Sequence, residues 1–160
     1  MYAFEPLPEN FGFLSENIQL NALSNTKCFN VGVGPHDQRA ALRLHRNQIN
    51  SLFSYRGVPA YSQISVELWS LGRILETVGE RIDLVKLDIE GMEFDALFSC
   101  LPSDLERVER IVLEYHDETI DCGHKVSELV GFLEMHKFTT QLFPAHRILA
   151  AWRNRKKRAL

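Results

Sequence analysis

Carboxyl side chains follow three apolar runs of this sequence, at the points where buried strands are expected to end. Glu5, Asp88 and Glu114 each come directly after such a run. In an open sheet of parallel strands, ligands bind beyond the carboxyl ends of the strands. A carboxylate there can accept hydrogen bonds from both hydroxyl groups of a ribose. For Glu5 alone, a polar residue that merely ends a strand is an equally good interpretation.

The segment 86–91 places two carboxylates, Asp88 and Glu90, two residues apart in a short turn before a helix. Such groups repel each other unless a cation or a hydrogen-bond donor lies between them. The alternative is structural, with Glu90 as a negative charge at a helix N-terminus and Gly91 providing backbone freedom. The sequence leaves both interpretations open.

His116 lies two residues beyond Glu114 and has the side chain best suited to accept a proton near neutral pH. A structural histidine at a strand end is the alternative. Asp88, Glu114 and His116 are also residue types that bind metal ions, but their spacing is not typical of a metal motif. No metal is therefore expected from the sequence.

Strands and helices must alternate to bring these residues together. Apolar positions with helical spacing and short apolar runs predict β-α-β units, which favour an α/β fold with a mainly parallel sheet and helices on both faces. The predicted strands are 2–4, 28–31, 82–88 and 108–115; the predicted helices are 8–23, 70–79, one after Gly91 with Phe94, Leu97, Phe98 and Leu101 inward, and one around 126–133; an antiparallel hairpin, 138–143 with 148–152, closes the chain.

The whole chain, 1–160, is interpreted as one domain. Within it, 1–38 and 69–152 carry the strand and helix units, and 39–68 is an insert of two alternating strands around an irregular loop. The end, 153–160, is a basic tail that we interpret as solvated.

Composition excludes several classes of protein. A net charge of -3 and a pI near 6.1 argue against binding to nucleic acid or to a membrane surface. No apolar run reaches the roughly 20 residues that cross a bilayer. Three cysteines, Cys28, Cys100 and Cys122, form no CxxC pair, which favours a reducing cytoplasm.

Taken together, these segments resemble the FkbM-type methyltransferases, a branch of the Rossmann-like enzymes that use S-adenosylmethionine (SAM). The resemblance extends over nearly the whole chain in order and spacing. The matching segments are 2–6 with 8–11, Asn17 and Asn21, 30–34, 50–52, 86–93 and 113–116.

The resemblance implies a role for each site residue. Glu5, with Pro6 beside it, would bind the ribose of SAM, and Gly32 and Val33 would border the adenine. Asp88 would lie near the methionine part of SAM and belong to the catalytic group as well. The other catalytic residues, Glu90, Glu114 and His116, would face a small-molecule or glycan acceptor. The family typically methylates hydroxyl oxygens of sugars or secondary metabolites.

The chain departs from the family pattern at its start. The family's sheet order is 3-2-1-4-5-7-6, and this chain opens at strand 2, without strand 1 or its glycine-rich GxGxG loop. Strands 2 and 4 would each lose a neighbour, and such edges can pair with another copy of the chain. The chain is then a fragment, has a start assigned too late, or is a degenerate domain. We expect full activity to need upstream sequence, and this truncated chain to be inactive if that sequence is missing. Trp69 is a second departure, because relatives usually have an acid there.

Two other functions are alternatives to methyl transfer. A residual Rossmann-like module would bind a partner or nothing and have no catalytic role. A nicotinamide-dependent oxidoreductase would need a GxGxxG turn about 20 residues before the ribose-binding acid, and no such turn precedes Glu5.

Overall fold

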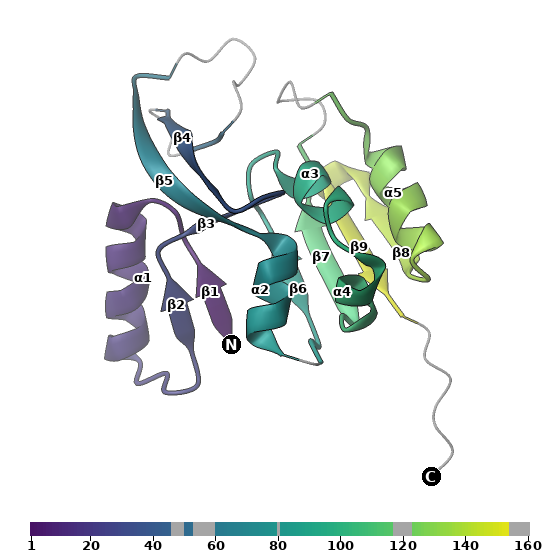
Figure 1. The fold of residues 1–160 in the computed structure, drawn as a ribbon, viewed down its shortest axis with the longest axis horizontal. Helices are drawn as coiled ribbons and strands as arrows, with labels where there is room; N and C mark the ends of the chain where they lie inside the picture. The colour runs from purple at the N-terminus through teal and green to yellow at the C-terminus, as the bar shows by residue number, and fades with distance from the viewer. Residues whose placement is uncertain (46–49, 53–59, 80, 117–122, 154–160) are drawn as a thin grey trace.

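Short strands alternate with helices along the chain (Figure 1). The structure, a computed structural model, describes residues 1–45, 50–52, 60–79, 81–116 and 123–153. The elements are β1 (Tyr2–Phe4), α1 (Pro8–Leu20), β2 (Lys27–Phe29), β3 (Gly32–Gly34), β4 (Gln38–Leu44), β5 (Ser62–Ser70), α2 (Leu71–Val78), β6 (Val85–Leu87), α3 (Glu93–Phe98), α4 (Pro102–Glu106), β7 (Arg110–Glu114), α5 (Val126–Met135), β8 (Thr139–Phe143), a 3₁₀ turn (Pro144–His146) and β9 (Ile148–Trp152).

The strands form three hydrogen-bonded groups, in the orders β1-β2, β3-β5-β4 and β6-β7-β9-β8. Within the described residues, β1–β2, β3–β5 and β6–β7 are parallel pairs, and β4–β5, β7–β9 and β8–β9 are antiparallel. The predicted α/β class and the closing hairpin are confirmed. The prediction of a mainly parallel sheet is wrong, because the insert and the hairpin add as many antiparallel pairs.

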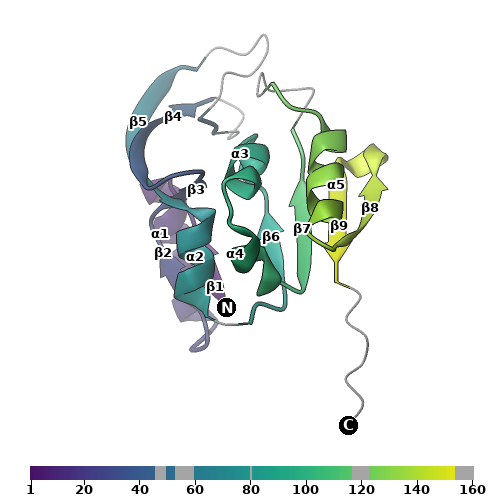
Figure 2. The ribbon, with the colours of Figure 1, turned by 45° about the vertical axis from the view of Figure 1, so that its right-hand side comes forward.

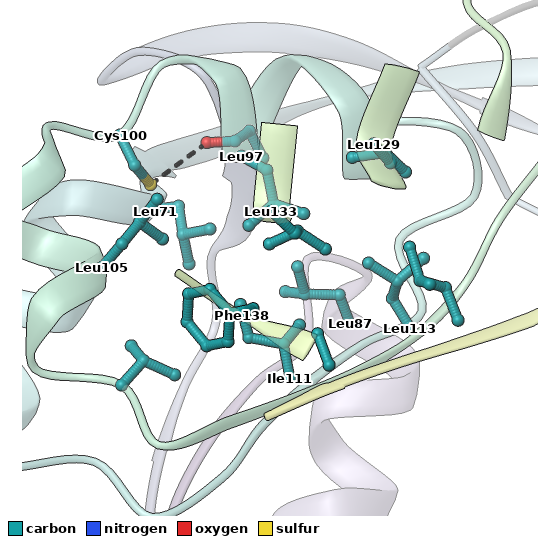
Figure 3. Close-up of a cluster of buried hydrophobic side chains, with 14 of the residues drawn as sticks. Leu71, Leu87, Leu97, Cys100, Leu105, Ile111, Leu113, Leu129, Leu133 and Phe138 are labelled. Carbon is teal, nitrogen blue, oxygen red and sulfur yellow. Dashed lines mark hydrogen bonds between the residues drawn. The ribbon is translucent and has the colours of Figure 1, made fainter. Parts of the chain in front are cut away.

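The larger hydrophobic core lies between the β6–β9 group and helices α2 to α5 (Figure 3). Buried residues alternate along β7 and β9, so one face of this group is covered and the other is only half-buried. In the described part of the chain, helices on both faces are therefore not found for β6–β9. Residues that fill this core include Leu71, Leu87, Leu97, Ile111, Leu113, Leu129, Leu133 and Phe138.

Cys100 belongs to this core. Burial, with the charge of Asp104, raises the pKa of its thiol to about 12, and the Sγ atom donates to the carbonyl of Ala96 at 3.4 Å. The residue therefore packs as a small apolar side chain. Cys28 is half-buried beside Ser15 of α1, and Cys122 lies outside the described residues.

Strands β1 and β6 each have a hydrogen-bonded neighbour on one side only, within the part of the chain that the structure describes. β1 pairs with β2, and β6 pairs with β7. The two edges are those that the sequence predicts to lose a partner. Pairing of either edge with another copy of the chain stays a prediction.

The insert forms a long curved hairpin, β4 with β5, that extends beyond the ends of β1 and β2 (Figure 1, Figure 2). Its two predicted strands are confirmed, and most of its loop, 46–49 and 53–59, lies outside the described residues. β3 was not predicted. Its Gly-Val-Gly sequence has no periodic pattern, and pairing with β5 makes it a strand.

The helices differ from prediction at two points. α1 ends at Leu20 instead of 23, and the single helix predicted after Gly91 is two helices. Pro102 cannot continue a helix but suits the first turn of a new one, so α4 begins there. Leu101 consequently faces solvent instead of the core. No described helix is long and apolar enough to span a bilayer.

Candidate active site at the carboxyl ends of β1, β6 and β7

A cavity of about 210 Å³ opens at the carboxyl ends of β1 and β6. Its floor is apolar, with Leu42, Val66 and Leu68 from the insert. Its lining also includes all the residues that the sequence predicts for the cofactor and two of the four predicted for catalysis, with Asp88 in both groups: Glu5, Pro6, Gly32, Val33, Asp88 and Glu90. These six residues thus share one pocket, although they come from elements far apart in the chain.

Two hydrogen bonds fix Glu5 at the end of β1, one made by its backbone and one made by its side chain. Its N–H donates to the carbonyl of Phe29 at 3.1 Å, and its Oε1 accepts the N–H of Leu7 at 2.8 Å. Burial raises the pKa of Glu5, although the bonds from Leu7 and the Asn10 side chain counteract it. The pocket therefore contains a carboxyl group that is partly removed from water.

Gly32 allows β3 to pass close beneath the pocket. A Cβ atom there would lie 2.6 Å from Leu68 Cδ2 and 3.2 Å from Pro6 Cβ. Contacts near 2.6 Å do not occur for real Cβ atoms, so a larger residue would force the buried Leu68 side chain, or β3 itself, to shift. The glycine predicted to border the adenine is thus also favoured by packing.

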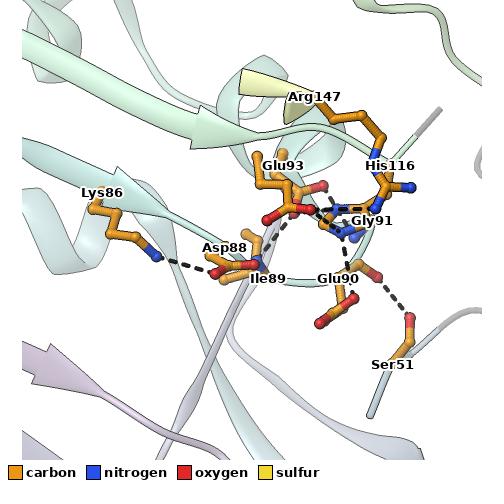
Figure 4. A network of polar contacts seen from close by, with 10 residues as sticks. Ser51, Lys86, Asp88, Ile89, Glu90, Gly91, Glu93, His116 and Arg147 are labelled. Atoms are coloured by element: carbon orange, nitrogen blue, oxygen red, sulfur yellow. Dashed lines mark hydrogen bonds and ion pairs between the residues drawn. The ribbon is translucent and has the colours of Figure 1, made fainter. Parts of the chain in front are cut away.

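The turn between β6 and α3 is organised by Glu93, as Figure 4 shows. The backbone N–H groups of Ile89 and Gly91 donate to its two carboxyl oxygens, each at 3.0 Å. Glu90 has a φ of 53° and Gly91 a φ of 100°, both in the left-handed region. A non-glycine residue in that conformation needs surrounding support, which Glu93 and the Ser51 hydroxyl, donating to the Glu90 carbonyl at 2.6 Å, provide.

His116 is buried against the same turn. Its Nδ1 lies 3.1 Å from Oε1 of Glu93, and its Nε2 lies 3.4 Å from Glu90 and 3.8 Å from Glu114. Burial lowers the pKa of His116, but the hydrogen bond to Glu93 and the charges of Glu93, Glu90 and Glu114 outweigh it and raise the pKa overall. The ring is fixed on its Nδ1 side, and Nε2 is directed at the carboxyl groups.

Asp88 links this cluster to the pocket. It lines the cavity, pairs with the exposed Lys86 at 3.1 Å, and can bring an oxygen within 4.8 Å of ligand atoms of both Glu114 and His116. Glu114 and His116 themselves are not among the pocket-lining residues. The structure thus groups the predicted residues into a pocket with Glu5 and an adjoining cluster around His116, with Asp88 and Glu90 in both.

Sequence reasoning gave Glu93 no role, although its side chain is completely buried. In the sequence it is an acid in the first turn of a helix, where surface acids are common. Its position in the sequence could have indicated the role. A carboxyl group in the first turn of a helix, a few residues after a tight turn, can reach back and accept the N–H groups of that turn.

An α/β domain with acidic side chains gathered around a pocket at strand ends belongs to the broad class that binds small ligands at this edge. The model of the Methyltransferase FkbM domain family matches residues 1–152, so the chain belongs to this family. It is similar to "Methyltransferase 1" of Beauveria bassiana (strain ARSEF 2860), at 25% identity over 139 residues, which cover 74% of this chain and 56% of that protein. No solved structure gives a significant match.

Proposed function

We propose that this domain transfers a methyl group from SAM to a hydroxyl oxygen of a small-molecule or glycan acceptor, within a Rossmann-like arrangement of strands. Membership of a methyltransferase family supports the reaction class. The main observation in support of the site is that Glu5 and Asp88 line one pocket, while His116 lies in the cluster that adjoins it. Because this chain spans only 56% of the relative's length, the activity of the whole protein is part of the proposal.

The residues that line the pocket have the chemistry needed to bind SAM, the methyl donor. A half-buried carboxyl group suits ribose hydroxyls, and Val33 with the close backbone at Gly32 suits a flat base. Asp88 and Glu90 supply negative charge for a sulfonium. The cavity of about 210 Å³ is below the roughly 300–1,000 Å³ of typical ligand sites, so it fits part of SAM rather than all of it.

SAM, when bound, supplies an electrophilic methyl group, and the protein must align the acceptor and accept its proton. His116 is suited to take that proton at Nε2. Glu93 fixes Nδ1 and, with Glu90 and Glu114, raises the pKa of the ring above its ordinary value, which makes Nε2 a stronger base. Glu93 thus serves as a positioning residue for His116.

Titration calorimetry with SAM tests the assignment of the pocket. The unchanged chain should bind SAM with micromolar affinity, and Glu5→Ala should weaken binding at least about 10-fold, because a good hydrogen bond to a charged group is worth about 1.5–3 kcal/mol. Glu9→Ala, which removes an exposed acid from the first turn of α1, is the matched control and should change nothing.

His116→Ala separates catalysis from binding in the same system. It should leave SAM affinity within about twofold and slow methyl transfer to a hydroxyl acceptor by roughly 10²-fold or more. Equal SAM affinity in Glu5→Ala would remove Glu5 from the site, and normal turnover in His116→Ala would remove His116 as the base. A complete absence of SAM binding would favour the non-catalytic module.

A further inference from the structure

The cluster beside the pocket has more negative than positive groups. Four carboxyl groups, those of Asp88, Glu90, Glu93 and Glu114, gather around His116. The positive partners are His116 itself when protonated and, at the edge, the exposed Lys86, paired with Asp88, and the half-exposed Arg147, 3.5 Å from Glu114. Exposed ion pairs of this kind contribute little and exchange readily with other cations. The arrangement therefore favours an additional positive charge.

Three side chains of this cluster lie close enough together to approach one ion. One ligand atom from each of Asp88, Glu114 and His116 lies within 4.8 Å of the other two. Ligand atoms about 2.1 Å from one ion are about 3 Å apart when adjacent and about 4.2 Å apart when opposite. Shifts of up to about 1 Å in each side chain would close the set, and the exposed Asp88 is able to move.

The orientation of His116 is an independent observation. Its side chain is only 5% exposed, its Nδ1 is bonded to the fully buried Glu93, and its Nε2 is thereby directed into the cluster. A metal-binding histidine typically uses its second nitrogen to contact a carboxylate in this way, which fixes the ring and increases its basicity.

We propose that Asp88, Glu114 and His116 bind one divalent first-row transition cation at the edge of the pocket. The imidazole ligand favours such an ion over Mg²⁺ or Ca²⁺, which prefer oxygen ligands alone. Spacing in the sequence does not indicate this site, because the three residues meet only when β6 and β7 pair in parallel. If the proposed methyl transfer is correct, the cation would bind the acceptor hydroxyl and ease its deprotonation, and His116 Nε2 would then serve as a ligand instead of as the base.

Binding of Mn²⁺ alone, without SAM or acceptor, tests the site separately from the proposed reaction. Titration calorimetry should show one Mn²⁺ per chain, and Asp88→Asn and Glu114→Gln should each weaken binding at least about 10-fold. The control is Asp83→Asn, which removes the same negative charge as Asp88→Asn. Asp83 is 76% exposed, pairs with Arg81 and precedes β6, so it lies away from the carboxyl end of that strand. The affinity of Asp83→Asn for Mn²⁺ should stay within about twofold of that of the unchanged chain.

Direct ligation by His116 has its own readout. Pulsed electron paramagnetic resonance of bound Mn²⁺ should show coupling to an imidazole nitrogen, and His116→Gln should abolish it. Mg²⁺ should displace Mn²⁺ only at about 10-fold or greater excess. The proposal is overturned by absent stoichiometric binding, by equal weakening in Asp83→Asn, or by bound Mn²⁺ without nitrogen coupling. None of these results would bear on SAM binding by Glu5.

Discussion

The two halves of the molecule that border the pocket are packed very differently. No residue from 1 to 30 is buried, and every side chain of α1 is half-buried or exposed. By contrast, the half formed by β6–β9 and helices α2 to α5 contains a continuous core with side chains such as Phe94, Leu97 and Leu129 fully buried. Glu5 thus comes from the loosely packed half, and His116 from the tightly packed one.

This difference indicates how the two parts of the proposed site can behave. Groups that accept or donate a proton in catalysis need a fixed geometry. The buried Glu93–His116 pair has one, because it packs against the hydrophobic core. Glu5 sits on a two-stranded unit whose stability depends on few buried contacts, so this unit should open first. Binding of a ligand by Glu5 would then stabilise the weaker half more than the stronger one.

Matched truncations provide the largest test of the comparison. Leu97→Ala in α3 should reduce the free energy of unfolding by about 2–5 kcal/mol, because it leaves a cavity in the core. Leu14→Ala in α1, at a half-buried position, should cost less than about 1 kcal/mol. Urea denaturation followed by circular dichroism measures both.

Equal losses in the two variants would break the comparison, because they would mean that α1 and β1 are covered in solution. Dependence of the Leu14→Ala effect on protein concentration would then identify a second copy as the cover. If Leu97→Ala does not fold, the milder Ile111→Val, expected to cost about 0.5–1.5 kcal/mol, replaces it.

The packed half was also easier to predict from the sequence. Its strands and helices carry regular apolar periods, which predict α2, α5 and the β8–β9 hairpin. Ser70 was predicted to cap α2, and its hydroxyl does accept the N–H of Arg73. β3 could not be predicted, because a short strand containing two glycines has no period and exists only through its pairing with β5.

The site was predictable in outline only. An acid after each of three apolar runs indicates a shared rim, and the structure does bring Glu5, Asp88 and Glu114 to strand ends around one region. Their individual roles stay predictions. The part played by Glu93 depends on burial, and burial results from tertiary packing that no local pattern encodes.

A pH series tests the rigid half with an effect of intermediate size. His116 has a higher pKa in the folded chain than in the unfolded one, because its bond to Glu93 and the nearby negative charges outweigh burial. Its contribution to stability is therefore complete below about pH 6.5 and is lost as the pH rises through the folded pKa. The gap in unfolding free energy between wild type and His116→Gln should narrow from pH 6 to pH 9.

The control for this series is His146→Gln, which removes an exposed imidazole from the turn before β9. Its stability should follow that of the wild type at every pH. A gap for His116→Gln that stays constant over the series would show that the ring stabilises the fold only by packing, and the electrostatic link to Glu93 would have to be dropped.

The smallest expected effect lies in the loose half, at Glu5. Burial raises the pKa of its carboxyl group, so ionisation at neutral pH disfavours the folded state. Glu5→Gln keeps an oxygen for the N–H of Leu7 but has no charge, and should raise the free energy of unfolding at pH 7 by up to about 0.5 kcal/mol. The gain should disappear as the pH falls toward the unfolded pKa, near 4.3.

Glu9→Gln, at an exposed position, should show no such gain in the same denaturation experiments. A side chain that is kept despite a cost to stability is more easily explained by ligand binding than by folding. If Glu5→Gln instead destabilised the chain by more than about 1 kcal/mol, the carboxyl group would be a structural support of β1 and the following turn. The ribose-binding role would then lose its physical basis, because the charge would already serve the fold.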